Sequence, residues 1–153
     1  MPTNYTLFRY LGSVRTASTF SWTPFTQDGD DFNWVVPVVD TNATNPGTSA
    51  VTSTFTVPTG VRVKANIFAK TTNGSTGIIY GLLSDLSITD TAPTSTILNF
   101  GMGSTGDPNH PGTLIGVYTN TSSQARYRLS ASAASDVVIL TTMGWNDTRQ
   151  KNA

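Results

Sequence analysis

The chain has 153 residues, a formal net charge of +0 at pH 7 and only 12% charged residues. This length fits one domain, which can remove about 68–70% of its extended-chain surface from water and needs no covalent cross-links. The balanced charge argues against a nucleic-acid partner, because such binding surfaces carry a clustered basic excess. The sequence contains no cysteine, which excludes a disulfide framework and thiolate chemistry.

The polar composition favours strands over helices. All 9 acidic residues are aspartate, and threonine, serine and asparagine are abundant. These short side chains compete with helix hydrogen bonds, whereas glutamate and lysine, the usual residues of helix surfaces, are absent or scarce. No apolar run approaches the length of a membrane span, and no apolar leader with a basic flank is present. We therefore expect a β protein with no membrane partner, made in the cytoplasm without a secretion signal.

Residues 1–22 predict an irregular arm, because they show no sustained hydrophobic period. The first hairpin signal is Asp28-Gly29, a dipeptide that favours positive φ in a two-residue turn. Pro37 lacks the N–H group that a strand ladder requires, so it predicts either a sheet edge or a bulge. The second strand of this hairpin is expected to place four apolar side chains on one face: Phe32, Trp34, Val36 and Val38.

The stretch 51–70 carries the strongest strand signal in the chain. Apolar side chains alternate with polar ones on both sides of Val57-Pro58-Thr59-Gly60. A proline and a glycine at these positions are typical of a type I turn. The pattern predicts two paired strands joined by this turn, and we expect the rest of the fold to grow outward from it.

Later segments predict further strands of the same domain. Asn73-Gly74 indicates another hairpin, and its returning strand, 77–84, is apolar on both faces and is expected to be central in a sheet. Residues 102–112, rich in glycine and proline, predict an exposed loop. The remaining candidate strands are 86–89, 96–101, 114–120, 125–132 and 136–143.

About eight to ten short strands with regularly spaced turn signals predict an all-β fold, an antiparallel β-sandwich or jelly roll with an irregular N-terminal arm. We expect the arm at 1–22, the sandwich domain at 23–145 and a C-terminal tail at 146–153.

Two features raise the question of a chemical site. Asp28, Asp30 and Asp31 lie close together, and hard cations bind aspartate oxygens, but the spacing does not match a calcium loop and a solvated hairpin tip is the simpler interpretation. His110 is the only histidine, so a small hydrolase would depend on it, yet no nucleophile-elbow sequence accompanies it. We assign no catalytic residue, no cofactor and no metal ion.

The sequence Arg126-Tyr127-Arg128 looks like a basic, aromatic nucleic-acid patch. In a strand, however, neighbouring side chains point to opposite faces. We therefore expect Tyr127 in the core and the two arginines on a polar outer or subunit-facing surface. The three tryptophans could stack on a sugar ring, but large aromatic residues are more often core or interface anchors.

Three stretches carry a family resemblance: LGSVRT…FTQDGDDFNW, TFTVPTGVRVKA and YTNTSSQARYRLSAS…ILTTMGWNDTR. Together they resemble a group of small proteins encoded by tailed bacteriophages and prophages, which close with Gly-Trp-x-Asp-x-Arg. This motif is matched by Gly144, Trp145, Asp147 and Arg149. The resemblance spans most of the chain and implies a component of the virion, and its motifs are structural, so it carries over no active site.

We therefore expect a non-enzymatic structural virion protein. A capsid decoration or cement subunit, or a small head or tail appendage, fits a compact domain that packs against copies of itself. The expected partners are other copies of the chain, with a trimer among the options, and virion proteins of the capsid or tail. The alternative is a tail-associated receptor-binding jelly roll that binds a host surface glycan through an exposed aromatic platform and a loop such as 102–112.

Both ends of the chain lack strand periodicity yet contain aromatic and arginine side chains, the types that dominate interface energies. We expect these ends to contact a neighbouring subunit or the capsid rather than to belong to the domain's own core. The predicted interface residues are Phe8, Arg9, Tyr10, Arg15, Trp22, Trp145 and Arg149.

Overall fold

The computed structural model describes residues 14–16, 22–72, 77–101 and 111–148. No helix among these residues is long and apolar enough to cross a membrane. The described residues form eight strands: β1 (Phe25–Asp28), β2 (Asp31–Thr44), β3 (Val51–Thr54), β4 (Lys64–Thr72), β5 (Gly81–Ser84), β6 (Thr113–Tyr118), β7 (Gln124–Leu129) and β8 (Val137–Asn146).

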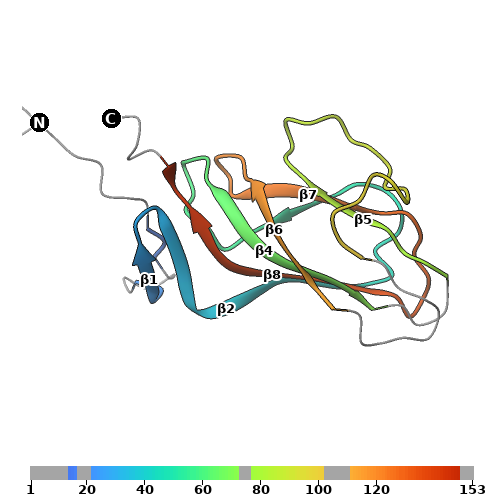
Figure 1. Ribbon diagram of the computed structural model, residues 1–153, viewed down its shortest axis with the longest axis horizontal. Coiled ribbons are helices and arrows are strands. Elements are labelled where there is room, and N and C mark those ends of the chain that lie inside the picture. The colour runs from blue at the N-terminus through green and yellow to red at the C-terminus, as the bar shows by residue number, and fades with distance from the viewer. Residues whose placement is uncertain (1–13, 17–21, 73–76, 102–110, 149–153) are drawn as a thin grey trace, which may run out of the picture.

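The strands form two packed sheets, as Figure 1 shows. One sheet has five strands in the order β1-β2-β8-β4-β6, and the other has three in the order β3-β7-β5. All of these pairings are antiparallel. Each connection from β2 to β8 crosses from one sheet to the other, which is the winding of a jelly roll. The predicted all-β sandwich is therefore confirmed.

The core lies between the sheets because alternate side chains of each strand point inward. In β4, Ala65, Ile67 and Ala69 are buried, while the residues between them are partly exposed. In β7, Tyr127 is buried and its neighbours Arg126 and Arg128 face outward, as their positions in a strand predict. Burial raises the pKa of the Tyr127 phenol.

The hairpin predicted at Asp28-Gly29 is confirmed. Asp28 pairs with Asp31, and Gly29 in the turn between them has a φ of 59°. β1 pairs only with the start of β2, so β2 becomes a sheet edge beyond Trp34. Its register against β8 also shifts between Asn33 and Val38, which places Pro37 in the predicted bulge.

The bulge corrects one expectation about the face of β2. Phe32 and Trp34 are buried, but Val36 is 72% exposed and does not share their face. The pairing with β8 is broken between Asn33 and Val38, so the alternation of side chains is interrupted there and Val36 points to solvent. Val38, where the pairing resumes, packs against the core as expected.

The expected pairing across Val57-Pro58-Thr59-Gly60 is wrong. β3 belongs to the three-stranded sheet and pairs with β7, whereas β4 lies in the other sheet between β8 and β6. Phe55, Val57 and Val63 are all buried, so the connection passes through the end of the core on its way between the sheets. Gly60 adopts a φ of 79° and donates its N–H to the Thr121 carbonyl oxygen at 2.7 Å.

The segment 77–84 is likewise not a returning partner of β4. Its strand, β5, is at the edge of the three-stranded sheet and pairs with β7. The Asn73-Gly74 turn lies outside the described residues. Residues 86–89 form no strand, and 96–101 contributes only an isolated bridge between Phe100 and Gly81. The last three strands, β6, β7 and β8, lie close to their predicted positions, but β8 continues past the predicted end at residue 143 to Asn146.

Candidate functional site

The structure describes three of the seven predicted interface residues: Arg15, Trp22 and Trp145. Phe8, Arg9, Tyr10 and Arg149 lie outside the described residues. Trp22 is 62% exposed, and its backbone bridges to Thr16. Arg15 donates hydrogen bonds to two backbone carbonyl oxygens of the domain, at 3.3 Å to Phe55 and 2.9 Å to Val57. Arg15 therefore ties its part of the arm to the sandwich of its own chain.

Trp145 is a core residue, so the expectation that it is a contact anchor outside the core is wrong. Its side chain is 0% exposed and stacks on Phe32, with ring centroids 4.9 Å apart and an interplanar angle of 7°. Phe25 and Trp34 pack around it, with centroids at 5.8 Å and 4.7 Å. We call these four residues the aromatic corner. β8 continues through Trp145 to Asn146, and the next residue, Asp147, is buried.

The closing motif of the sequence seals this corner. A side chain at Gly144 would overlap the Phe32 carbonyl oxygen and the Asn33 Cα, so β8 and β2 lie too close together here to leave room for a Cβ atom. Asp147 donates its backbone N–H to the Asp30 carbonyl oxygen at 2.9 Å. The described part of the motif therefore holds the end of β8 against the β1–β2 hairpin.

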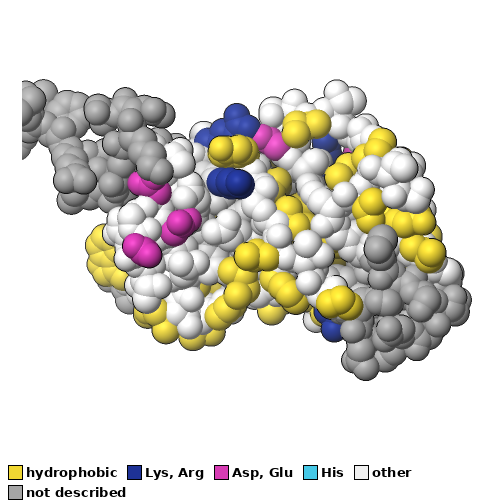
Figure 2. All heavy atoms as spheres, viewed as in Figure 1, with side chains coloured by type: hydrophobic (Ala, Val, Ile, Leu, Met, Phe, Trp, Pro, Cys, Tyr) yellow, Lys and Arg dark blue, Asp and Glu magenta, His cyan; other side chains and the backbone are white. Residues whose placement is uncertain are grey.

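A row that is apolar at three of its four positions crosses the outer face of the five-stranded sheet. Register pairs Val39 with Thr141, Thr141 with Phe68, and Phe68 with Leu114. We call these four residues the outer row. Val39 is 57% exposed and Leu114 is 65% exposed. The row continues toward exposed valines near the bend of β2, where Figure 2 shows hydrophobic side chains gathered.

A second candidate surface is a hollow of about 400 Å³ at the open edge of the sandwich. It lies between β5 and β6, which belong to opposite sheets, and residues 85–99 form its far wall. Three of its apolar lining residues, Ile88, Ile97 and Tyr118, are exposed side chains. We call the hollow the edge groove, with the principal lining residues Ser84, Ile88, Thr91, Ile97, Val117 and Tyr118.

An ion pair borders the edge groove. Arg62 pairs with Asp85 and lies over the Tyr118 ring, with its guanidinium carbon 5.1 Å from the ring centroid. Burial opposes ionisation of Asp85, but the Ser87 N–H and the Arg62 guanidinium outweigh it and hold the pKa of this carboxyl below its usual value. Arg62 thus packs against the Tyr118 ring, and Tyr118 also lines the groove.

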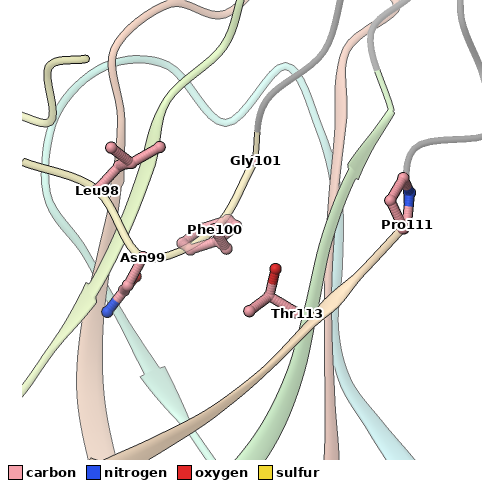
Figure 3. A pocket seen from close by; sticks show the side chains of 6 residues that line it. All are labelled: Leu98, Asn99, Phe100, Gly101, Pro111 and Thr113. Atoms are coloured by element: carbon pink, nitrogen blue, oxygen red, sulfur yellow. The ribbon is translucent and has the colours of Figure 1, made fainter. Parts of the chain in front are cut away.

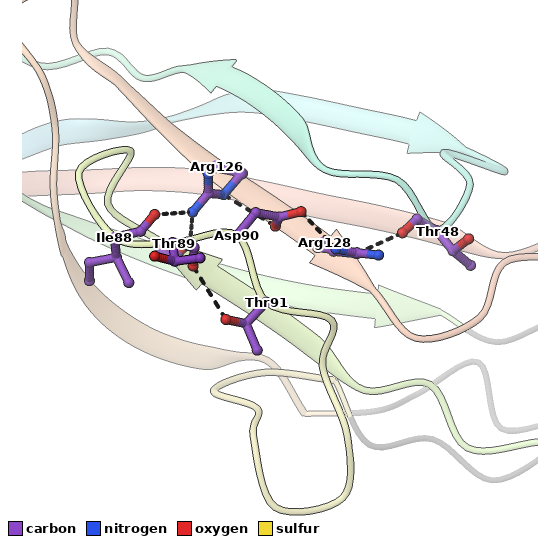
Figure 4. Close-up of polar contacts among 8 residues, drawn as sticks. Thr48, Ile88, Thr89, Asp90, Thr91, Arg126 and Arg128 are labelled. Carbon is purple, nitrogen blue, oxygen red and sulfur yellow. Dashed lines mark hydrogen bonds and ion pairs between the residues drawn. The ribbon is translucent and has the colours of Figure 1, made fainter.

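Arg126 and Arg128 are occupied by contacts within the chain. Arg128 Nη1 lies 2.7 Å from Asp90 Oδ2, and Arg126 Nε lies 3.5 Å from Asp90 Oδ1 (Figure 4). Arg126 also donates to the Ile88 carbonyl oxygen at 2.6 Å, and Arg128 donates to that of Thr48 at 2.9 Å. The contacts with Ile88 and Asp90 join β7 to residues 88–90, which belong to the far wall of the edge groove.

Another hollow, of about 450 Å³, lies between residues 98–101 and the start of β6, and Figure 3 shows its lining side chains. It borders the ends of segment 102–110, which contains His110 and lies outside the described residues, so we assign it no ligand. Within the described ranges, no three histidine or acidic side chains gather in a metal-binding arrangement. In the Asp28–Asp31 cluster, Asp31 accepts a hydrogen bond from the Asn146 amide at 2.8 Å.

The sequence reasoning missed both exposed surfaces. Tyr118 and Leu114 could have been found, because each alternates with the inward-facing Ile115 and Val117 of β6. Ile88 and Ile97 follow no period, so only the fold brings them to the groove. Comparison of the chain with protein-family models, with curated protein sequences and with solved structures finds no match.

Proposed function

We propose that this chain is a non-enzymatic structural subunit of a tailed-bacteriophage virion, either a capsid decoration or cement subunit or a small head or tail appendage that self-assembles. The observation that carries this proposal is the outer row, an apolar strip exposed on the broad face of the larger sheet. Jelly-roll domains are common in viral particles, and exposed apolar patches often mark protein interfaces. The family resemblance of the sequence points in the same direction.

The polar surface supports assembly rather than nucleic-acid binding. Arg62, Arg126 and Arg128 are each paired with an aspartate of the same chain. A phosphate backbone would have to compete with these carboxylates for the guanidinium groups. Three arginines that are already paired with carboxylates favour contacts with another neutral protein surface over contacts with phosphate groups.

The edge groove favours one second candidate, a receptor-binding module on the tail. Tyr118 is 48% exposed beside hydroxyl side chains of Ser84 and Thr91. An aromatic ring next to short polar groups is the kind of surface that the alternative expectation of a glycan-binding jelly roll requires.

Mass spectrometry and immunogold microscopy of purified particles test the main proposal. We expect the chain in intact virions at a fixed copy number, with labels at defined positions on the head or tail. Its presence only in the soluble fraction of infected cells would contradict the proposal.

Sedimentation of the purified chain tests the role of the outer row. The double substitution Val39→Lys with Leu114→Lys introduces two charges into the strip and should shift the oligomer toward the monomer without unfolding it. Ile78→Lys is the matched control, because Ile78 is also exposed but precedes β5 in the other sheet. Equal effects of the two changes would remove the outer row as the assembly surface.

A further inference from the structure

We propose that the edge groove binds a neutral pyranose, a sugar unit with no charged group. This inference rests on the receptor-binding form of the proposed function and names its ligand class and site. A pyranose has one face of C–H bonds and a rim of hydroxyl groups. Its recognition therefore needs an aromatic or aliphatic surface together with hydrogen-bond donors and acceptors near the edge of that surface.

The groove has the apolar surface that such a ring needs. Tyr118 contributes an aromatic ring to the lining, and Ile88 and Ile97 line the same hollow with exposed aliphatic side chains. The volume of about 400 Å³ lies within the range of small-ligand sites, about 300–1,000 Å³. The Arg62 guanidinium over the tyrosine ring helps to hold the ring in place, and Tyr118 remains 48% exposed.

Two hydroxyl groups among the lining residues have hydrogen-bonding capacity left for a sugar. Ser84 Oγ accepts a hydrogen bond from Arg126 at 3.4 Å, so its own proton can be donated to a ligand. Thr91 Oγ1 donates to the Thr89 carbonyl oxygen at 3.3 Å, so its lone pairs can accept one. A donor on β5 and an acceptor on the far wall match the two roles of a sugar hydroxyl.

The far wall of the groove is held at several points. Asn99 bonds both the N–H of Leu83, at 2.8 Å, and its carbonyl oxygen, at 2.7 Å, and so fixes one end of the wall to β5. Arg126 and Asp90 fix the other end to β7, as Figure 4 shows. A site whose walls are tied in this way loses little conformational entropy when a ligand binds.

Charge argues for a neutral ligand. Asp85, the carboxylate that lines the groove, is paired with Arg62, and Arg126, behind the wall, is paired with Asp90. A carboxylated sugar would have to approach Asp85 and compete with it for Arg62, which costs free energy. Groove and ligand are therefore complementary in having no net charge.

Nuclear magnetic resonance of the full chain tests the inference. The probes are the methyl glycosides of glucose, galactose and mannose, together with N-acetylglucosamine and, as the charged comparison, glucuronate. We expect at least one neutral sugar to shift the amide signals of Ile88, Thr91 and Tyr118 saturably at millimolar concentration. Glucuronate should bind more weakly than the matched glucoside.

Two substitutions locate the site. Tyr118→Ala should weaken sugar binding by about tenfold, because the stacking surface is lost. Tyr118→Phe keeps the ring and should retain most of the affinity. Trp22→Ala is the control, since Trp22 is exposed but does not line the groove.

The inference is overturned if no neutral sugar shifts the groove signals, if Trp22→Ala rather than Tyr118→Ala abolishes binding, or if glucuronate binds most tightly. Sedimentation of the same samples separates the two proposals. Absence of sugar binding by a chain that still assembles and enters virions refutes the groove alone. Sugar binding by a chain that is absent from virions refutes the proposed function and leaves a free glycan-binding protein.

Discussion

The aromatic corner and the edge groove are both rich in apolar side chains, yet one is sealed and the other is open. In the corner, the β1–β2 hairpin folds over Trp145 and β8 pairs directly with β2, so the aromatic rings pack on one another. At the groove, β5 and β6 are the edges of opposite sheets and do not pair with each other, and residues 85–99 line one side of the gap. Strand pairing, rather than composition, therefore decides which apolar cluster becomes part of the core.

Removing the central ring of the corner should have the largest effect. We expect Trp145→Ala to reduce the free energy of unfolding by about 3–5 kcal/mol, because it leaves a large cavity between the sheets. The measurement is chemical unfolding followed by circular dichroism. A loss below about 1 kcal/mol would mean that the corner repacks and that the contrast with the groove is smaller than the structure indicates.

Adding one methyl group to the corner should have the next largest effect. Gly144→Ala would place a Cβ against the backbone of β2, and we expect a loss of about 1–3 kcal/mol. Gly77→Ala is the matched control, because no atom lies within 4 Å of its Cβ position and its φ is not positive. Similar melting temperatures for the two variants would show that β2 and β8 can separate here at little cost.

The ion pair beside the groove should matter chiefly at acid pH. The pKa of Asp85 is lowered in the folded state, so its contribution to stability is present above the unfolded pKa and is lost as pH falls through the folded pKa. We therefore expect Asp85→Asn to flatten the decline in melting temperature below about pH 4. The expectation fails if wild type and variant follow parallel pH profiles.

Truncating the groove aromatic should have the smallest effect on stability. Tyr118 is exposed, so Tyr118→Ala should change the free energy of unfolding by no more than about 0.5 kcal/mol. The same unfolding experiment as for Trp145→Ala measures it. A loss comparable to that of the corner would show that Tyr118 is part of the core and would weaken its assignment as a ligand surface.

Much of the candidate site could not be predicted from the sequence, because it depends on which strand edges lie next to each other in the fold. The alternation in β6 places Leu114 and Tyr118 on an outward face, and this much is readable in the sequence. Whether that face is covered depends on the partner strands and on the path of residues 85–99. Trp145 shows the converse, because its position near the end of the chain indicated a free anchor, whereas the extension of β8 places it in the core.

The sequence by itself determined the all-β class, the hairpin at Asp28-Gly29, a sheet edge or bulge at Pro37 and the inward side chains of β4 and β7. These features follow from local physics: turn residues that tolerate positive φ, a proline without an N–H group and the two-residue period of a strand. Tertiary structure alone decided that β3 and β4 lie in opposite sheets, that β5 is an edge and that Trp145 is sealed. Alternation specifies which side of a strand faces the core, but a buried face is satisfied equally well by a partner in the same sheet or across the sandwich, so only the packing of the whole chain selects between them.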